Sequence, residues 1–147
     1  MMKTFTLDEA QSLLPLVESL LKRATDSKNA AEEIEADLGR IIRRIHQVGG
    51  MMVDVGRIAV QRATLDQYVQ RAKETIAEID TIGVQIKDLD TGLLDFPCRV
   101  DDEIVLLCWK AGESAIEYWH TTEAGFKGRQ PIDERFRRRI SPNSRPN

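Results

Sequence analysis

The sequence predicts an α+β fold in which a long antiparallel helical hairpin packs against a small antiparallel sheet of three to four strands. Two observations predict it: apolar residues keep a helical spacing over residues 7–82, and after Gly83 apolar and polar residues alternate. We expect one α+β domain over residues 1–133, made of the hairpin and a sheet and motif block at 83–133. A basic, flexible tail is expected at 134–147.

The first helix is predicted to begin near Leu7. Thr6-Leu-Asp-Glu9 has the form of a capping box, in which the Thr hydroxyl and the Glu carboxylate bind backbone N–H groups at a helix start. Pro15 lacks an N–H and its ring crowds the preceding turn, so a kink or a fresh start is expected there. Three-and-four apolar spacing then continues to Val48, and Gly49-Gly50 is predicted to end the helix.

A second helix is predicted from Arg57 to Ile82, because apolar residues recur from Ile58 to Ile79 at intervals of three, four and seven. The two helices would lie antiparallel, and their apolar seam can close within one chain or join two chains as a coiled coil. Met51-Met-Val-Asp-Val55 is expected to pack on the hairpin tip. Since this periodicity is the strongest pattern in the chain, the function we favour is a non-enzymatic interaction or assembly module that forms a homodimer.

Two turns predict a three-stranded antiparallel meander after Gly83. Val100-Asp-Asp-Glu103 reads as a two-residue hairpin turn, and Ala111-Gly-Glu-Ser114 as a second turn. These turns would pair Val100 with Glu103 and Lys110 with Ala115. The strands are expected near residues 93–100, 103–109 and 115–121, with a fourth near Val84–Lys87.

This register places Asp95, Cys108 and Glu117 in one cross-strand row. Two carboxylates beside a thiol are ligands that a divalent metal ion accepts. His120 is expected on the opposite face, where it joins the group only if its strand bends or ends first. The alternative is that Asp95 and Glu117 are solvated or form salt bridges with Arg99 and Arg129, and that Cys108 is a small buried residue.

A second candidate function is binding of a metal or a small ligand at the C-terminal sheet, with hydrolysis as one form of it. The last third of the chain holds both Trp and both Cys residues. Gly125-Phe-Lys-Gly-Arg-Gln130 offers cations and backbone N–H groups to an anion, or is a simple loop pinned by its Phe. The candidate ligand-binding residues are Asp95, Trp109, Trp119, His120, Lys127 and Arg129, and the candidate metal ligands are Asp95, Cys108, Glu117 and His120.

A cysteine nucleophile receives little support from the sequence. In the predicted register, Cys98 and His120 share a face but stand two strand spacings apart, roughly 10 Å. This separation is too long for a thiol and its base.

Charge and composition restrict the classes of partner that the protein is expected to bind. The formal net charge is -3, yet residues 134–147 hold five Arg and one Glu, so the rest of the chain is more acidic than the total indicates. We therefore expect the body to repel nucleic acid and only the tail to attract RNA, as a third option, through Arg135, Arg137, Arg138 and Arg139. Two cysteines, an N-terminus unlike a secretion signal and the lack of a membrane-length apolar run predict a cytoplasmic protein.

Several short motifs resemble a known bacterial family when taken in order. They are Phe5-Thr-Leu-Asp-Glu-Ala10, Leu13-Leu-Pro15, Gly83-Val-Gln-Ile-Lys-Asp88, Gly92-Leu-Leu-Asp-Phe-Pro97, Leu107-Cys-Trp109, Gly112-Glu113, Tyr118-Trp-His120 and Gly125 to Ile132. Over residues 5–132 the chain resembles the domain of unknown function 2203 family. The resemblance implies a small cytoplasmic bacterial protein with a helical region followed by a compact motif block, and it assigns no catalytic or binding residue. Asp101-Asp102 and the Arg-rich tail depart from the family pattern.

Overall fold

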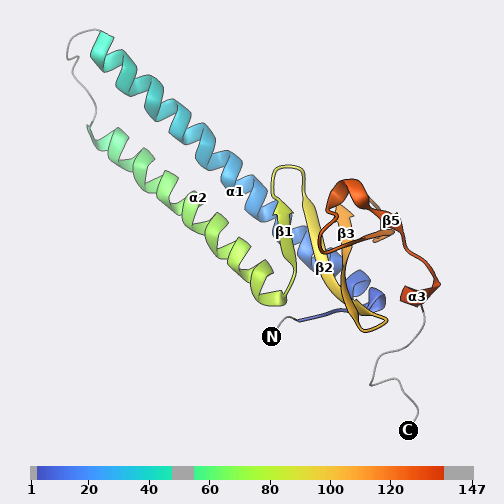
Figure 1. Ribbon diagram of the computed structural model, residues 1–147. Helices are drawn as coiled ribbons and strands as arrows, with labels where there is room; N and C mark the ends of the chain where they lie inside the picture. The colour runs from blue at the N-terminus through green and yellow to red at the C-terminus, as the bar shows by residue number, and fades with distance from the viewer. Residues whose placement is uncertain (1–2, 48–54, 138–147) are drawn as a thin grey trace. The chain divides into compact units, whose positions relative to one another are not determined.

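The computed structural model describes residues 3–47 and 55–137 and confirms the α+β class (Figure 1). Its elements are α1 (Leu7–Gln47), α2 (Val55–Ile82), β1 (Gln85–Asp88), β2 (Leu93–Val100), β3 (Glu103–Lys110), β4 (Tyr118–Thr121), the 3₁₀ turn η1 (Phe126–Gly128), β5 (Gln130–Pro131) and α3 (Glu134–Arg137). The chain divides into two compact units. We call Met1–Leu21 with Glu78–Asn147 the sheet unit and Lys22–Ala77 the hairpin unit.

Helix α1 begins at the predicted capping box. The N–H of Thr6 donates to Glu9 Oε1 at 2.9 Å, and the N–H of Glu9 donates to Thr6 Oγ1 at 3.1 Å. The sequence predicted a kink or a fresh start at Pro15; the helix continues through this residue, so the fresh start is excluded. Pro15 is exposed whereas Leu14 and Val17 are buried, and packing on both sides of the proline holds the helix despite one missing hydrogen bond.

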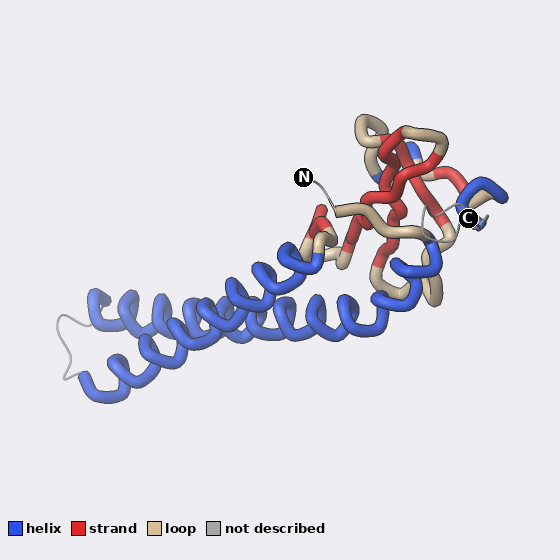
Figure 2. The backbone as a smooth tube through the Cα atoms, turned by 90° about the horizontal axis from the view of Figure 1, so that it is seen from below, coloured by secondary structure: helices blue, strands red, loops and turns tan. Residues whose placement is uncertain are grey.

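In the hairpin unit, α1 and α2 run antiparallel and side by side (Figure 1 and Figure 2). The helical hairpin that the apolar spacing predicted is therefore confirmed. Its buried side chains are mostly small: Ala24, Ser27, Ala31, Leu38, Ala72 and Thr75. The larger seam residues Ile34, Ile41, Ile45, Ile58, Leu65 and Ile76 stay half-buried. The predictions for Gly49-Gly50 and for the connection up to Asp54 fall outside the described residues.

The sheet is an antiparallel meander in the order β1-β2-β3-β4-β5. Val100 pairs with Glu103, as predicted, and Asp101 and Asp102 have φ of 52° and 65°, which a type I′ turn requires. Strand β1 is the predicted fourth strand. Strand β5 was not predicted, because two residues, one of them a proline, carry no alternating pattern.

The predicted register between β3 and β4 is wrong by one residue. Cys108 pairs with Tyr118 rather than with Glu117. The chain between the two strands is longer than a tight turn, and Glu113 folds back on its start. The indole N–H of Trp109 donates to the Glu113 carbonyl, and the N–H of Lys110 donates to the Glu113 carboxylate, both at 2.9 Å. These bonds close a turn at the start of the loop, and residues 114–117 then extend the loop before β4 begins at Tyr118.

A shift of one residue turns every β4 side chain to the other face of the sheet. Trp119, predicted on the mixed face, lies in the hydrophobic core. His120, predicted on the core face, lies on the same face as Asp95 and Cys108. Glu117 precedes the strand and is exposed, so it does not belong to the cross-strand row.

The core of the sheet unit joins the first turns of α1 to one face of the sheet. Phe5 packs edge-on against Phe96, with ring centroids 5.8 Å apart. The core includes Leu14, Val17, Leu20, Ile79, Leu94, Phe96, Cys98, Leu107, Trp109 and Trp119. Phe136 of α3 also packs there, with its ring centroid 5.5 Å from that of Trp119. The folded structure thus extends past residue 133, where the tail was predicted to begin.

A side chain at position 92 would cause two kinds of strain, one in the backbone and one by steric contact. The φ of Gly92 is +73°, and an added Cβ would approach the Cβ of Ala111 to 2.5 Å. We predict that Gly92→Ala lowers the free energy of unfolding by about 3 kcal/mol, since positive φ alone costs roughly 1–2 kcal/mol. Urea denaturation measures the change.

Gly112→Ala is the matched control, because Gly112 also has positive φ but has no neighbour within 4 Å of the added Cβ. The free energy of unfolding of this variant should fall only by the cost of the positive φ, about 1–2 kcal/mol. Equal losses in the two variants would contradict the role assigned to the Ala111 contact.

Candidate functional site

Three buried side chains of different chemistry meet on the face of the sheet that is turned away from the core. Asp95 of β2 and Cys108 of β3 are cross-strand partners, and His120 of β4 lies diagonally from Cys108. Their exposed fractions are 1, 0 and 3%. One potential ligand atom from each, namely a carboxylate oxygen, the Sγ and a ring nitrogen, lie within 4.8 Å of one another. Because the Cys108 side chain is short, the side chains of Asp95 and His120 can meet across it.

The two nitrogens of His120 both face oxygen atoms. Nδ1 lies 2.7 Å from the carbonyl oxygen of Thr121, which can only accept, so we assign the proton to Nδ1. Nε2 lies 3.1 Å from Asp95 Oδ1, and these two atoms share one further proton. Asp95 Oδ2 is buried and has no hydrogen-bond partner at ordinary distance, although the neighbouring Cys108 thiol also acts on the Asp95 carboxylate. A buried carboxylate oxygen without a partner is costly, and a cation would satisfy it.

Burial dominates the acid–base properties of this cluster. It raises the pKa of Asp95, and His120 and Lys87 oppose the rise. Burial and the charge of Asp95 raise the pKa of Cys108 to about 11, with Arg129 acting in the opposite direction. The free thiol is therefore neutral near pH 7 and poorly suited to nucleophilic attack.

Arg129 is held beside the cluster by three neighbours. It follows η1, and its Nη1 donates to Glu113 Oε2 at 2.8 Å. Its guanidinium carbon lies 4.1 Å from the ring centroid of Tyr118 and 4.3 Å from that of Phe126. The charge of Arg129, a candidate for anion binding from the sequence, is thus already paired with Glu113, and Lys127 of η1 is exposed.

Sequence reasoning missed Glu113, Tyr118 and Phe126 as partners of Arg129. No motif indicates these contacts, since they depend on the β3–β4 register and on the fold of the chain after β4. The expectation that Phe126 would pin the loop to the core is not met, because its ring is exposed and stacks on Arg129 instead.

The two tryptophans named as candidate ligand-binding residues do not join the cluster. Trp109 and Trp119 lie in the core on the opposite face of the sheet, and both are buried. Cys98 also lies on that face, so it does not share a face with His120 as predicted. The correction has the same cause as before, the one-residue shift of β4.

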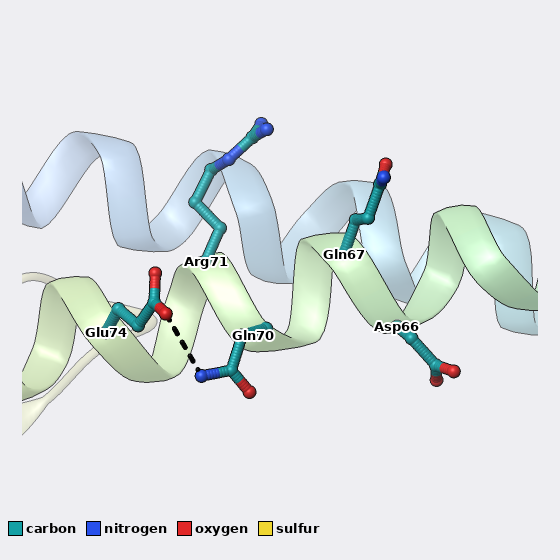
Figure 3. A pocket seen from close by; sticks show the side chains of 5 residues that line it. All are labelled: Asp66, Gln67, Gln70, Arg71 and Glu74. Atoms are coloured by element: carbon teal, nitrogen blue, oxygen red, sulfur yellow. Dashed lines mark hydrogen bonds between the residues drawn. The ribbon is translucent and has the colours of Figure 1, made fainter.

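A surface hollow lies on the hairpin unit and contains none of the candidate residues. It is lined by Asp66, Gln67, Gln70, Arg71 and Glu74 of α2. Figure 3 shows these side chains pointing in different directions along one helix, with a single hydrogen bond of 3.1 Å from Gln70 to Glu74. The hollow does not gather convergent polar groups in the way that a ligand pocket does.

The cluster of Asp95, Cys108 and His120 fits a metal ion in its donor set. One oxygen, one sulfur and one imidazole nitrogen are the ligand types that zinc-like ions accept. In a tetrahedral site, ligand atoms stand about 3.5 Å apart, so small side-chain adjustments would bring the three atoms into place. The carbonyl of Thr121 would orient the imidazole by holding Nδ1–H.

Comparison with known proteins identifies the family. None of the helices in the described residues is both long enough and apolar enough to cross a bilayer. No curated protein and no solved structure matches the chain. The family described as "Uncharacterized conserved protein (DUF2203)" matches residues 3–132, which include Asp95, Cys108 and His120. The match covers most of the chain and confirms the resemblance seen in the motifs, so the protein belongs to this family of uncharacterised conserved proteins.

Proposed function

We propose that the protein binds a divalent metal ion of zinc-like preference through Asp95, Cys108 and His120. The observation that carries the proposal is the buried meeting of three different donor atoms within 4.8 Å, beside a carboxylate oxygen that has no partner. Exposed acidic groups often gather without a metal, whereas buried polar groups normally satisfy one another. Here the three side chains leave Asp95 Oδ2 without a partner.

Charge balance supports the same proposal. Without a metal, the cluster holds one proton between Asp95 and His120 and a second proton on the Cys108 thiol. A divalent ion that replaced both protons would leave the total buried charge unchanged. Arg129 would then face a metal-bound thiolate, and its positive charge would stabilise that form.

The geometry favours binding over hydrolysis. Three protein ligands would leave one coordination position, as in catalytic zinc sites, yet each of the three side chains is at most 3% exposed. The proposed function is therefore metal binding in the interior of the sheet unit. The hydrolase reading has no comparable observation in its favour.

Cobalt(II) binding tests the site directly, because a thiolate ligand produces a charge-transfer band in the near ultraviolet. We predict that the protein, stripped with chelator and then titrated with cobalt(II), binds about one ion per chain and shows this band. Cys108→Ser should abolish the band, and His120→Asn should weaken binding by at least about tenfold. Circular dichroism establishes that each variant is folded.

Cys98→Ser is the matched control, since Cys98 is buried in the same strand pair but on the other face. It should keep the band. Failure of the wild-type protein to bind, or a band that persists in Cys108→Ser, would contradict the proposal.

Thiol reactivity tests the environment assigned to both cysteines. Burial raises the pKa of Cys98 and of Cys108 to about 11, against 9.0 for an ordinary thiol. At pH 8 the thiolate fraction falls about a hundredfold, so native metal-free protein should alkylate with iodoacetamide at least that much more slowly than unfolded protein. Intact-mass spectrometry follows the reaction. Rapid modification of Cys108 in the native state would indicate an open, reactive thiol and favour the enzyme reading.

Self-association through the hairpin is a second candidate function. The observation that favours it is the incomplete burial of the seam in the hairpin unit, where the isoleucines and Leu65 stay half-buried. Val69 of α2 is 37% exposed and Ile42 of α1 is 40% exposed. A second hairpin packed on these residues would bury apolar surface that one hairpin leaves in water.

Sedimentation equilibrium at micromolar concentration tests this candidate. We predict a dimer that Val69→Glu weakens at least about tenfold, because a charge would enter the apolar contact. Leu16→Glu is the control, since Leu16 is 49% exposed but lies outside the hairpin unit, and it should leave the dimer intact. A wild-type protein that is only monomeric would remove the candidate.

A further inference from the structure

Basic residues concentrate at one end of the hairpin unit. We define the distal hairpin as residues 38–47 of α1 and 55–65 of α2. Between residues 38 and 65 the chain holds five Arg and no Lys, and Asp54 is the one acidic residue. The remainder of residues 1–133 holds eleven Lys or Arg and 22 Asp or Glu. The negative net charge of residues 1–133 therefore conceals a local basic region. The five arginines are Arg40, Arg43, Arg44, Arg57 and Arg62.

The fold brings the arginine-bearing turns of α1 and α2 to the same end of the hairpin (Figure 1 and Figure 2). Because α1 and α2 run antiparallel and side by side, the last turns of one lie beside the first turns of the other (Figure 1 and Figure 2). Arg40, Arg43 and Arg44 follow three-and-four spacing, so they share one side of α1, opposite the buried Leu38. All five arginines are exposed.

Much of this charge is available to a partner. Arg40 pairs with Asp37 of the preceding turn. Arg43, Arg44 and Arg62 form no ion pair within the parts of the chain that the structure describes. A surface with several solvated guanidinium groups and few neighbouring carboxylates creates a positive potential that attracts polyanions.

The residue types point to phosphate as the ligand group. The guanidinium group is a planar fork of donors that matches phosphate oxygens, and arginine is preferred over lysine for this contact in nucleic-acid recognition. Arg40 and Arg44 are about 6 Å apart along the helix axis, which is close to two phosphate steps of about 3.4 Å each along the axis of a nucleic-acid duplex. We infer that the distal hairpin binds the phosphate backbone of a nucleic acid without reading its bases.

A membrane surface fits these observations less well. Helices that lie on membranes carry an apolar face that enters the bilayer, usually with aromatic anchors. The distal hairpin exposes Ile42, Val55 and Val60, but residues 38–65 contain no Phe, Tyr or Trp that would anchor them at a bilayer. These three aliphatic side chains do not form the continuous apolar face with aromatic anchors that a membrane-surface helix uses.

Fluorescence anisotropy with labelled single-stranded RNA and double-stranded DNA tests the inference on the full chain. We expect a Kd of about 1–100 μM at physiological salt. In the double variant Arg43→Glu with Arg44→Glu, affinity should fall at least about tenfold, and the slope of log Kd against log salt should fall by about 2. Circular dichroism monitors the helices of each variant.

The double variant Arg71→Glu with Lys73→Glu is the matched control. It makes the same change in charge on exposed positions of α2 outside the distal hairpin. Affinity should stay within about twofold of the wild type, because screening confines the effect of exposed charges to roughly a Debye length. Equal weakening in both double variants would show a response to total charge and would overturn the inference.

Two further experiments distinguish binding by the distal hairpin from binding by the tail and from binding to a membrane surface. If deleting residues 138–147 abolishes binding while the distal charge reversal leaves it unchanged, the Arg-rich tail is the contact and the inference fails. Tighter binding to anionic phospholipid vesicles than to either nucleic acid, without competition by RNA, would also overturn it. The distal hairpin contains no residue of the proposed metal site, so chelator should leave nucleic-acid binding unchanged. The two proposals can therefore fail separately.

Discussion

The arrangement of the C-terminal half depends on the pairing of Cys108 with Tyr118 between β3 and β4. Because side chains alternate along a strand, this single register decides which β4 residues enter the core and which face the other side. Glu113 orders the start of the β3–β4 loop, because its carbonyl accepts a hydrogen bond from the Trp109 indole and its carboxylate accepts one from the N–H of Lys110. The same Glu113 carboxylate accepts a hydrogen bond from Arg129. Glu113 thus connects the start of the β3–β4 loop to Arg129, which lies beside the polar cluster.

The two faces of the sheet have opposite chemistry as a result. One face is apolar and packs against the first turns of α1, with Phe96, Leu107 and Trp109 almost fully buried. The other face buries Asp95, Cys108 and His120, which is energetically costly unless each polar atom finds a partner. His120 satisfies both of its nitrogens, but Asp95 does not satisfy both of its oxygens. This imbalance is the physical basis of the proposed metal site.

The hairpin unit follows different rules. Its seam combines small buried residues with larger half-buried ones, so packing within one chain leaves apolar surface in water. Its charges are also separated along the sequence: residues 31–37 contain four acidic residues and no basic one, and residues 38–47 contain three Arg and no acidic residue. Such separation has little effect on the fold but strongly affects which partners approach each region.

Local interactions could be predicted from the sequence. The capping box at Thr6, the long helices and the two-residue turn at Asp101-Asp102 were found because hydrogen bonds and side-chain spacing within a few residues determine them. The presence of Asp95, Cys108 and His120 near one another was expected only in part, with Glu117 placed in the row and His120 on the wrong face. The sequence by itself determined the α+β class, the hairpin and the β2–β3 register. Only the tertiary structure decided the β3–β4 register, the contact of Asp95 with His120 and the burial of Phe136, because these depend on a loop of irregular length and on contacts between residues far apart in the chain.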